Sequence, residues 1–261
     1  MRRICLFAGY DKEHKIHDYV VYMIKKLSKI SDVYYMADCA LPPDELFKIA
    51  PYTQMFYTRE HTLKDFGSWH YLINRLGWDK IRQYDELILC NDSVYGPLFD
   101  LPAIFKQMET RGFDFWSMTA DYTHNYHLHR YFMVFNQSII NHRTFQDFWK
   151  YVPMSYSVKN CELELTPLLI NQGFVCNSYI RNYKQKNILQ SPQKILREVY
   201  PPFIKTKSFT AENAYTAGSG LELRYKIRTK TDYDTALINR HLLQSHSPQT
   251  LSQRLVCFSG I

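Results

Sequence analysis

Short apolar runs alternate with stretches of helical periodicity through the first part of the chain. Four runs that favour buried strands span residues 4–8, 33–36, 54–57 and 87–90. Between the first two runs, Tyr19, Met23 and Leu27 recur at helical spacing, which predicts a helix that reaches Ile30. Strand, helix and strand at this spacing form a βαβ unit, whose right-handed crossover makes the two strands parallel. The pattern therefore predicts an α/β fold with a mostly parallel sheet.

The fourth run is followed by a cluster of short polar side chains and then by a turn. Asn91, Asp92 and Ser93 come directly after residue 90, and Gly96-Pro97 ends the strand pattern. In parallel α/β sheets, ligands bind outside the carboxyl ends of the strands, where such oxygen-bearing side chains suit a cation, a ribose or a phosphate. The alternative is an ordinary turn in which these side chains cap their own backbone. The residue types alone leave both interpretations open.

Two further stretches place carboxylates near predicted helix starts. Asp65 precedes Gly67, where a helix start would favour an anion, and an N-cap role for Asp65 is compatible with this. Glu162 and Glu164 open an apolar helix that Gly173 ends, and complementarity to the helix dipole explains such acids without catalysis. Because the two glutamates are two residues apart, they point to different faces. One can cap the helix while the other faces a cleft.

Three histidines, His124, His127 and His129, lie between two predicted strands at residues 113–118 and 130–135. They could converge on a metal ion, but their spacing matches no helical ligand pair such as i and i+4. Isolated loop histidines are more common than ligands, so we favour the interpretation without zinc. The six cysteines contain no CxxC pair, which argues against zinc and is typical of reduced, buried thiols in a cytosolic protein.

The size and charge of the chain narrow the function classes. Its 261 residues suffice for one large α/β domain or two small ones. A net charge of +7 favours anionic partners such as a nucleotide diphosphate or a polyanionic glycan. No nucleic-acid-binding signature accompanies this charge, so nucleic acid is not an expected partner. Arg224, Lys226, Arg228 and Lys230 alternate with other residues, which predicts the solvent face of a strand.

The sequence carries no signal for membrane insertion. Basic residues at the amino terminus precede an apolar run of only five residues, which is too short for the core of a signal peptide. No other window approaches the length of apolar sequence that crosses a membrane. We therefore expect a cytoplasmic protein whose contact with the inner face of the cell membrane is at most peripheral.

The order of these features resembles a nucleotide-diphospho-sugar glycosyltransferase of the GT-A fold. Residues 87–93 correspond to the strand and DxD-type metal motif of those enzymes, although residues 91–93 offer one carboxylate instead of two. A closer resemblance is to the rhamnan synthesis protein F family, whose hallmarks run in order from residue 4 to about residue 210. They are residues 5–11 (CLFAGYD), 65–69 (DFGSW), 91–97 (NDSVYGP), 130–135 (RYFMVF) and 202–205 (PFIK).

This resemblance implies a fold and an activity. The expected fold is a GT-A-like, Rossmann-type sandwich with a mostly parallel central sheet over residues 1–210, and a C-terminal appendage of residues 211–261 packing on it. The expected activity is transfer of rhamnose or a related deoxyhexose from a nucleotide diphosphate to a growing surface polysaccharide such as lipopolysaccharide O-antigen. The partners would be the nucleotide-sugar donor and a glycan or lipid-linked glycan acceptor.

The resemblance further implies roles for individual residues. Glu162, eleven residues before Gly173, matches the catalytic acid of family 2 glycosyltransferases and is the expected general base, with Glu164 as the second catalytic candidate. Asp92 is expected to hold Mg²⁺ or Mn²⁺ at the diphosphate. The expected donor-binding residues are Tyr10, Asp11 and Asp65 at the nucleoside, Arg59 at ribose or phosphate, Lys205 and Lys207 at the leaving phosphates, and Asn91 and Ser93 beside Asp92.

Two other classes remain open. A protein that binds nucleotide sugars without catalysis, within a polysaccharide assembly complex, is compatible with the single carboxylate of residues 91–93. A Rossmann-type oxidoreductase is disfavoured because the turn at residues 8–11 lacks the G-x-G-x-x-G fingerprint that binds a dinucleotide. Release of nucleoside diphosphate in the presence of an acceptor would separate an enzyme from a binding protein.

Overall fold

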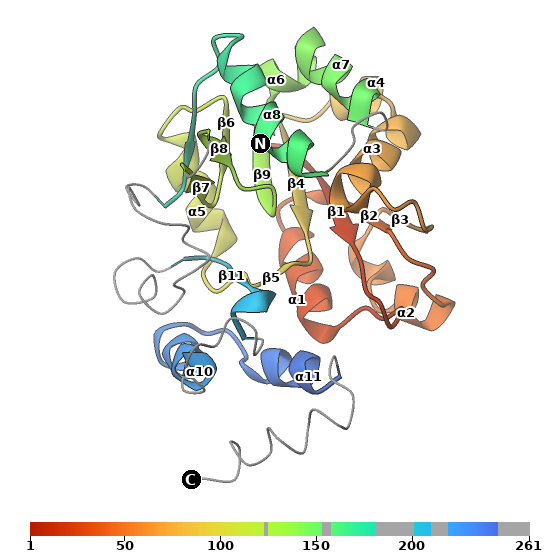
Figure 1. Cartoon of the computed structure of the whole chain (residues 1–261), viewed down its shortest axis with the longest axis vertical. Helices are drawn as coiled ribbons and strands as arrows, with labels where there is room; N and C mark the ends of the chain where they lie inside the picture. The colour runs from red at the N-terminus through yellow and green to blue at the C-terminus, as the bar shows by residue number, and fades with distance from the viewer. Residues whose placement is uncertain (123–124, 153–157, 181–200, 210–218, 245–261) are drawn as a thin grey trace.

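The computed structural model describes residues 1–122, 125–152, 158–180, 201–209 and 219–244. Within this part of the chain, a seven-stranded sheet lies between two layers of helices (Figure 1). The strands follow the spatial order β10-β6-β9-β4-β1-β2-β3. Their bounds are Arg3–Gly9 (β1), Asp32–Ala37 (β2), Met55–Thr58 (β3), Glu86–Asn91 (β4), Phe115–Ser117 (β6), Phe132–Asn136 (β9) and Cys176–Ser178 (β10).

The sheet is mostly parallel, which confirms the predicted fold class. β1 pairs in parallel with β2 and β4, β2 pairs in parallel with β3, and β6 pairs in parallel with β10. β9 is the exception, because it runs antiparallel to both β4 and β6. Every residue of β4 is buried, as its continuous apolar run predicts for a central strand covered on both faces.

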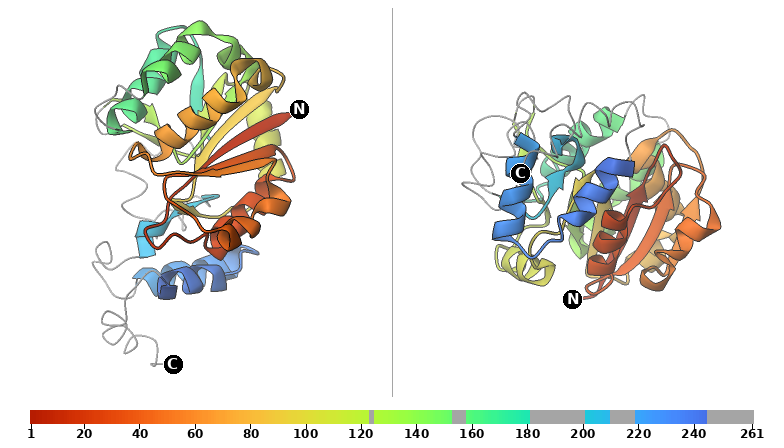
Figure 2. Two further views of the ribbon diagram at one scale, coloured as in Figure 1. Left: turned by 90° about the vertical axis from the view of Figure 1, so that its right-hand side faces the viewer. Right: turned by 90° about the horizontal axis from the view of Figure 1, so that it is seen from below.

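Two helical layers bury the two faces of the sheet (Figure 2). Alternate residues of β1 point to opposite layers: Cys5 and Phe7 face one, Ile4 and Leu6 the other. The first layer contains α1 (Asp18–Leu27), α2 (Pro43–Phe47), η1 (Ala50–Tyr52) and α5 (Leu101–Glu109). The second contains α3 (Lys64–Leu76), α4 (Trp78–Ile81), α6 (Gln137–Asn141), α7 (Arg143–Tyr151) and α8 (Val158–Ile170).

Two small sheets extend from the carboxyl side of the main sheet. β5 (Val94–Tyr95) pairs antiparallel with β11 (Ile204–Lys205), which leads into η4 (Thr206–Phe209). β7 (Ala120–Asp121) pairs antiparallel with β8 (His127–Leu128) to form a hairpin. Gly96 makes the first pairing possible, because a Cβ atom there would lie 2.7 Å from the carbonyl oxygen of Pro202.

Of two C-terminal helices, α10 (Ser219–Lys230) packs against η4 and α11 (Ala236–Gln244) lies beside α1 and β5 (Figure 1). Leu223 and Ile227 are buried in the core of the first layer, so the predicted strand at residues 224–230 is wrong. Buried residues four apart form the apolar stripe of a helix, and the alternating basic residues obscure it in the sequence. The division of the chain at residue 210 stays a prediction, since residues 210–218 lie outside the described part.

The described residues also bear on the expectations for the cysteines and for membrane-spanning helices. The cysteines at positions 5, 39, 90, 161 and 176 form no disulfide, and Cys257 lies outside the described residues. Cys5 and Cys90, on neighbouring strands, place their sulfur atoms 3.5 Å apart as thiols. Among the helices of the described ranges, none combines the length and the apolar character that spanning a membrane requires.

Candidate active site

The polar cluster predicted from the sequence lies at the carboxyl end of β4. Asn91 is the last residue of β4, and Asp92 and Ser93 connect this strand to β5. Asn91 Oδ1 accepts hydrogen bonds from the backbone N–H of Ser93 at 3.1 Å and from Ser93 Oγ at 2.7 Å. Asn91 and Ser93 thus form the capped turn that their residue types allow. Asp92 makes different contacts, which connect it to the loop after β1.

Asp92 is held by the first residues of that loop and by α1. Its Oδ2 atom accepts a hydrogen bond from the backbone N–H of Tyr10 at 2.7 Å, and its carbonyl oxygen accepts one from the Tyr19 hydroxyl at 2.8 Å. Desolvation by the surrounding protein, together with the negative charges of Asp11 and Asp65, raises the pKa of Asp92 to about 7. A positive charge bound beside this carboxylate would therefore be strongly stabilised.

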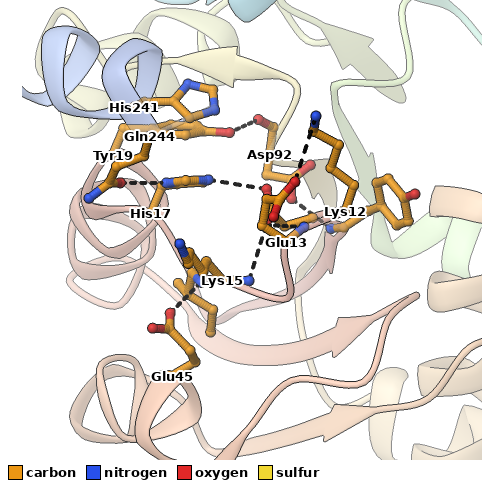
Figure 3. Close-up of polar contacts among 12 residues, drawn as sticks. Lys12, Glu13, Lys15, His17, Tyr19, Glu45, Asp92, His241 and Gln244 are labelled. Atoms are coloured by element: carbon orange, nitrogen blue, oxygen red, sulfur yellow. Dashed lines mark hydrogen bonds and ion pairs between the residues drawn. The ribbon is translucent and has the colours of Figure 1, made fainter. Parts of the chain in front are cut away.

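Asp11 fixes the shape of the same loop through contacts with Glu13, Lys15 and His17, which Figure 3 labels. Its Oδ1 atom accepts hydrogen bonds from the backbone N–H groups of Glu13 at 2.9 Å and Lys15 at 3.1 Å, and its Oδ2 atom lies 3.1 Å from His17 Nε2. Burial opposes the charge of Asp11, but the contacts with His17 and the backbone prevail and lower its pKa. Tyr10, next to it, is 61% exposed and offers a ring face for stacking.

Arg130 joins acidic residues from two helices. Its Nε atom donates to Asp65 Oδ2 at 2.6 Å, and its Nη1 atom forms an ion pair with Glu162 Oε2. The backbone N–H of Arg130 also donates to Glu162 Oε1 at 3.1 Å. Asp65 in turn accepts a hydrogen bond from Asn91 Nδ2 at 2.9 Å. A continuous set of contacts therefore runs from the end of β4, through α3, to Glu162 on α8.

Lys205 reaches this cluster through the pairing of β11 with β5, in which Lys205 lies opposite Val94. Its Nζ atom donates to Ser93 Oγ at 2.9 Å and lies 4.6 Å from the centre of the Tyr131 ring. Burial and the positive charge of Arg130 lower the pKa of Lys205 to about 8, although nearby carboxylates act in the opposite direction. The site therefore contains a cation that titrates close to physiological pH.

Three other residues predicted for the site lie at the surface. Arg59 follows β3 and is exposed, with its backbone N–H bonded to the carbonyl oxygen of Ala37 at the end of β2. Glu164 is exposed on α8, and Lys207 is exposed in η4, two residues after Lys205. The roles expected for Arg59, Glu164 and Lys207 stay predictions.

The local positions of the acidic residues differ from the sequence prediction. Leu63 occupies the N-cap position of α3, so Asp65 lies in the first helical turn and its predicted N-cap role is wrong. α8 begins at Val158, so Glu162 and Glu164 lie inside the helix and do not open it. Because the helix dipole acts mainly in the first turn, it does not account for these two glutamates.

Arg130 is the residue of this cluster that sequence reasoning missed. No spacing rule connects it to Asp65 or Glu162, because the three residues come from separate elements of the fold. Its place at the start of the RYFMVF motif is the one signal that the sequence offers. The same limit applies to Tyr131, whose ring contacts Lys205.

The acidic residues around Asp92 fit a divalent cation on electrostatic grounds. Asp11 and Asp65 raise the pKa of Asp92 by repulsion, so a cation among these carboxylates would relieve that repulsion. Carboxylate oxygens are also the ligands that Mg²⁺ and Mn²⁺ prefer. Asp92 therefore suits the predicted cation, and its role as a ligand stays a prediction.

Comparison with known sequences identifies the family. The family described as Rhamnan synthesis protein F (RgpF) matches residues 33–257. The chain belongs to this family. The resemblance carried by the sequence motifs is thereby confirmed. The chain is also similar to the uncharacterized protein y4gN of Sinorhizobium fredii, with 26% identity over 163 residues, or 59% of the chain. The alignment covers 42% of that relative, so the chain spans less than half of its length.

Two solved structures of enzymes that act on nucleotide sugars or related sugars are similar to this chain, and only the first is similar enough to bear on the fold. The apo form of the glycosyltransferase GlyE from Streptococcus pneumoniae TIGR4 aligns with a TM-score of 0.51 and 12% identity, covering 94% of this chain and 64% of that one. A nucleoside-diphosphate-sugar pyrophosphorylase from Vibrio cholerae RC9 aligns with a TM-score of 0.42 and 10% identity, covering 67% and 90% respectively. With the sheet described above, the likeness to GlyE confirms a GT-A-like fold.

Proposed function

We propose that this member of the rhamnan synthesis protein F family transfers rhamnose or a related deoxyhexose from a nucleotide diphosphate to a growing surface polysaccharide. The transfer inverts the anomeric configuration, with Glu162 as general base. The acceptor is a glycan or lipid-linked glycan at the cytoplasmic face of the cell membrane, for example a precursor of lipopolysaccharide O-antigen. Family membership and fold support the donor class, and the geometry of the site supports the mechanism.

One observation carries this proposal: a connected group of side chains runs from Asn91, the residue before Asp92, to Glu162. Asn91, next to Asp92, donates to Asp65, which contacts Arg130. Arg130 in turn binds Glu162 through both its side chain and its backbone. A nucleotide sugar across the strand ends would meet Asp92 on its diphosphate side and Glu162 on its acceptor side. This is the arrangement that the chemistry needs.

Glu162 accepts the proton of the acceptor hydroxyl as that oxygen attacks the anomeric carbon. The bond from the anomeric carbon to the phosphate oxygen breaks, and its electron pair leaves with the nucleoside diphosphate. Attack and departure occur on opposite faces of the sugar, so the configuration inverts in a single displacement. The exposed Glu164 is then not required for the chemical step.

Arg130 has to release Glu162 before this glutamate can act as a base. Both carboxylate oxygens of Glu162 accept hydrogen bonds from Arg130. A donor diphosphate offers the guanidinium a second anionic partner, because Arg binds phosphate in the same bidentate manner as carboxylate. Binding of the donor would thus draw Arg130 away and free the base, so the donor binds before the acceptor.

The remaining predicted residues bind the donor. Lys205 and Arg130 neutralise the departing diphosphate, the electrostatic contribution that usually dominates such reactions. A divalent cation at Asp92 would supply further charge neutralisation at the diphosphate. The exposed Tyr10 ring stacks on the nucleoside, in a loop that Asp11 shapes. The other donor contacts in this proposal are Asn91 and Ser93 beside the phosphates, Asp65 near the nucleoside, Arg59 at the ribose and Lys207 at the leaving group.

Paired substitutions of the two glutamates test the base. Glu162→Gln should reduce turnover by ~10²–10⁴-fold, the usual contribution of a general base, while donor affinity changes little. The amide oxygen of the new side chain can still accept the hydrogen bond from the backbone of Arg130, so the fold should persist. Glu164→Gln is the matched control and should keep near wild-type turnover. A dead Glu164→Gln enzyme beside an active Glu162→Gln enzyme would show that the base is misassigned.

A second candidate function is supported by the same ion pair. If Arg130 keeps Glu162 engaged after the donor binds, the chain is a nucleotide-sugar-binding protein without catalysis. Release of nucleoside diphosphate, measured with a panel of nucleotide sugars and an acceptor glycan, separates the two functions. Binding of a donor that raises the melting temperature without any release would favour the binding protein.

A further inference from the structure

A second group of potential ligands lies on the hairpin formed by β7 and β8. The strand register pairs Asp121 with His127, and the backbone N–H of His129 donates to the carbonyl oxygen of Thr119 at 3.0 Å. Residues two apart on a strand share a face, so Asp121, His127 and His129 project from one side of the hairpin. Each offers one ligand atom within 4.8 Å of the others, and all three side chains are buried.

Hydrogen bonds orient both imidazole rings for coordination. His127 Nδ1 lies 2.8 Å from the carbonyl oxygen of Asn125, which can only accept, so a neutral His127 carries its proton on Nδ1 and a lone pair on Nε2. His129 Nδ1 lies 2.8 Å from Thr119 Oγ1, whose hydroxyl lies 2.8 Å from the hydroxyl of Tyr131. Metal-binding histidines commonly use their second ring nitrogen in this way.

We propose that Asp121, His127 and His129 form a transition-metal site that takes Zn²⁺. Two imidazoles and one carboxylate are a ligand set of zinc sites that keep an open position, whereas Mg²⁺ prefers oxygen ligands. His129 Nε2 lies 3.8 Å from Asp121 Oδ2, which is too long for a hydrogen bond. Ligand atoms on a tetrahedral zinc ion lie about 3.4 Å apart, so the three ligand atoms, which lie within 4.8 Å of one another, would move closer together around a bound ion.

The sequence prediction without zinc rested on the lack of a helical ligand spacing and on the rarity of ligands among loop histidines. The i and i+2 spacing of His127 and His129 places both rings on one face once they lie along a strand. Asp121, which did not enter that prediction, is the third ligand because β7 turns back onto β8. His124 lies outside the described residues.

The zinc site shares no residue with the group around Glu162, but it adjoins that group in two places. Tyr131 bonds Thr119 through its hydroxyl and contacts Lys205 through its ring. The backbone N–H of Leu128 donates at 3.1 Å to the hydroxyl of Thr166, on the helix that carries Glu162. Zinc bound here would fix the hairpin against both elements. The inference holds whether or not Glu162 is the base.

The test uses the purified full chain, stripped of metal with a chelator and then titrated separately with Zn²⁺, Mn²⁺ and Mg²⁺. We expect about one Zn²⁺ per chain by elemental analysis, a rise in melting temperature with Zn²⁺, and little response to Mg²⁺. Substitution by Co²⁺ should give the intense visible absorption of a tetrahedral site, a readout that needs no variant. A chain that retains no stoichiometric zinc, or that prefers Mg²⁺, would overturn the proposal.

Variants locate the ion. Asp121→Asn and His127→Gln should each lose stoichiometric zinc and the Co²⁺ absorption, whereas His14→Gln, a change to an exposed histidine elsewhere, should keep both. Asp92→Ala should also keep the zinc, which separates this site from the cation expected at the diphosphate. Equal retention of zinc by Asp121→Asn, His127→Gln and the unaltered chain would place the ion elsewhere and refute the assignment.

Discussion

The amino group of Lys205 lies 2.9 Å from the hydroxyl of Ser93, although 112 residues separate them in the sequence. The pairing of β11 with β5 creates this proximity, and the backbone N–H of Thr206 reinforces it by donating to the Ser93 carbonyl oxygen at 3.0 Å. The loop after β4 thus receives a half-buried cation from the C-terminal part of the chain.

Activity should fall as pH rises through the pKa of Lys205, which burial lowers to about 8. Below this pH the amine is charged and can neutralise a phosphate, and above it the charge is lost. The pH profile of kcat/KM for the donor should therefore fall above pH ~8, whereas kcat should hold to higher pH because the bound donor raises the pKa. Lys205→Arg should move the decline of kcat/KM to higher pH, since the guanidinium group stays protonated. An identical decline in Lys205→Arg would assign it to another group.

Asp92 should lose its affinity for a cation as pH falls. Its pKa of about 7 means that the carboxylate is charged above neutrality and becomes protonated below it. Stimulation by Mn²⁺ should therefore decline between pH ~8 and ~6, and Asp92→Ala should abolish it. Activity assays over this pH range, with and without excess chelator, measure the effect. Wild-type activity that excess chelator leaves unaltered would remove the cation from the mechanism.

Loss of Arg130 should destabilise the fold as well as the site. Arg130→Ala leaves Asp65 and Glu162, whose side chains are 10% and 15% exposed, without their shared cation. Because the pair is only partly buried, we expect a loss of about 1–3 kcal/mol in the free energy of unfolding, measured by urea denaturation. The exposed Arg59→Ala variant is the control and should change stability by less than about 0.5 kcal/mol. Equal effects of the two substitutions would contradict this account.

The His17 ring should make stability depend on pH. Burial opposes its charge, but hydrogen bonds to Asp11 and Gln244 prevail and raise its pKa above 6.5. The stabilisation of the fold by the charged His17 ring is complete below the unfolded-state pKa and is lost as pH rises through the folded-state pKa. Asp11 has a lowered pKa, so its contribution is present above pH 3.8 and disappears in stronger acid. The ion pair of His17 and Asp11 should therefore stabilise the loop at pH values between the folded-state pKa of Asp11 and that of His17.

Melting temperatures between pH 5.5 and pH 8.5 check this expectation. The wild-type chain should lose stability over the upper part of this range, and His17→Gln should show a flatter profile and a lower melting temperature at pH 5.5. His14→Gln, which changes an exposed ring in the same loop, should follow the wild type. A flat wild-type profile would mean that the pKa of His17 is the same in the folded and the unfolded chain, which would contradict the expectation.

Local sequence patterns predicted the central strands and the first helix well. The apolar runs located β1 to β4, and the spacing of Tyr19, Met23 and Leu27 located α1, because burial on a fixed face leaves a period in the sequence. The reversed direction of β9 left no such trace, since strand direction depends on the path of the connections. The strand predicted at residues 224–230 failed because charges at every second position resembled a strand face, while Leu223 and Ile227 carried the helical stripe.

The candidate site was predictable only in part. Asp92, Ser93 and Asn91 follow a buried strand, and general rules for parallel sheets place such residues at a binding edge. The contacts of Arg130 with Asp65 and Glu162 arise from three elements brought together by folding, and no local pattern encodes them. The exposed position of Arg59 was equally invisible, because the direction of a side chain after a strand depends on the loop that follows.

The pairing of β11 with β5 determines when, during synthesis, the candidate site can be completed. During synthesis, the ribosome releases residues 1–180 before the strand that carries Lys205, and the nascent chain at that stage already holds Asp92 and Glu162. The contacts of the loop after β1 are completed later still, because His17 in this loop binds Gln244, the last residue of α11. A translation product truncated ahead of residue 205 would therefore possess both carboxylates but lack the lysine that binds Ser93.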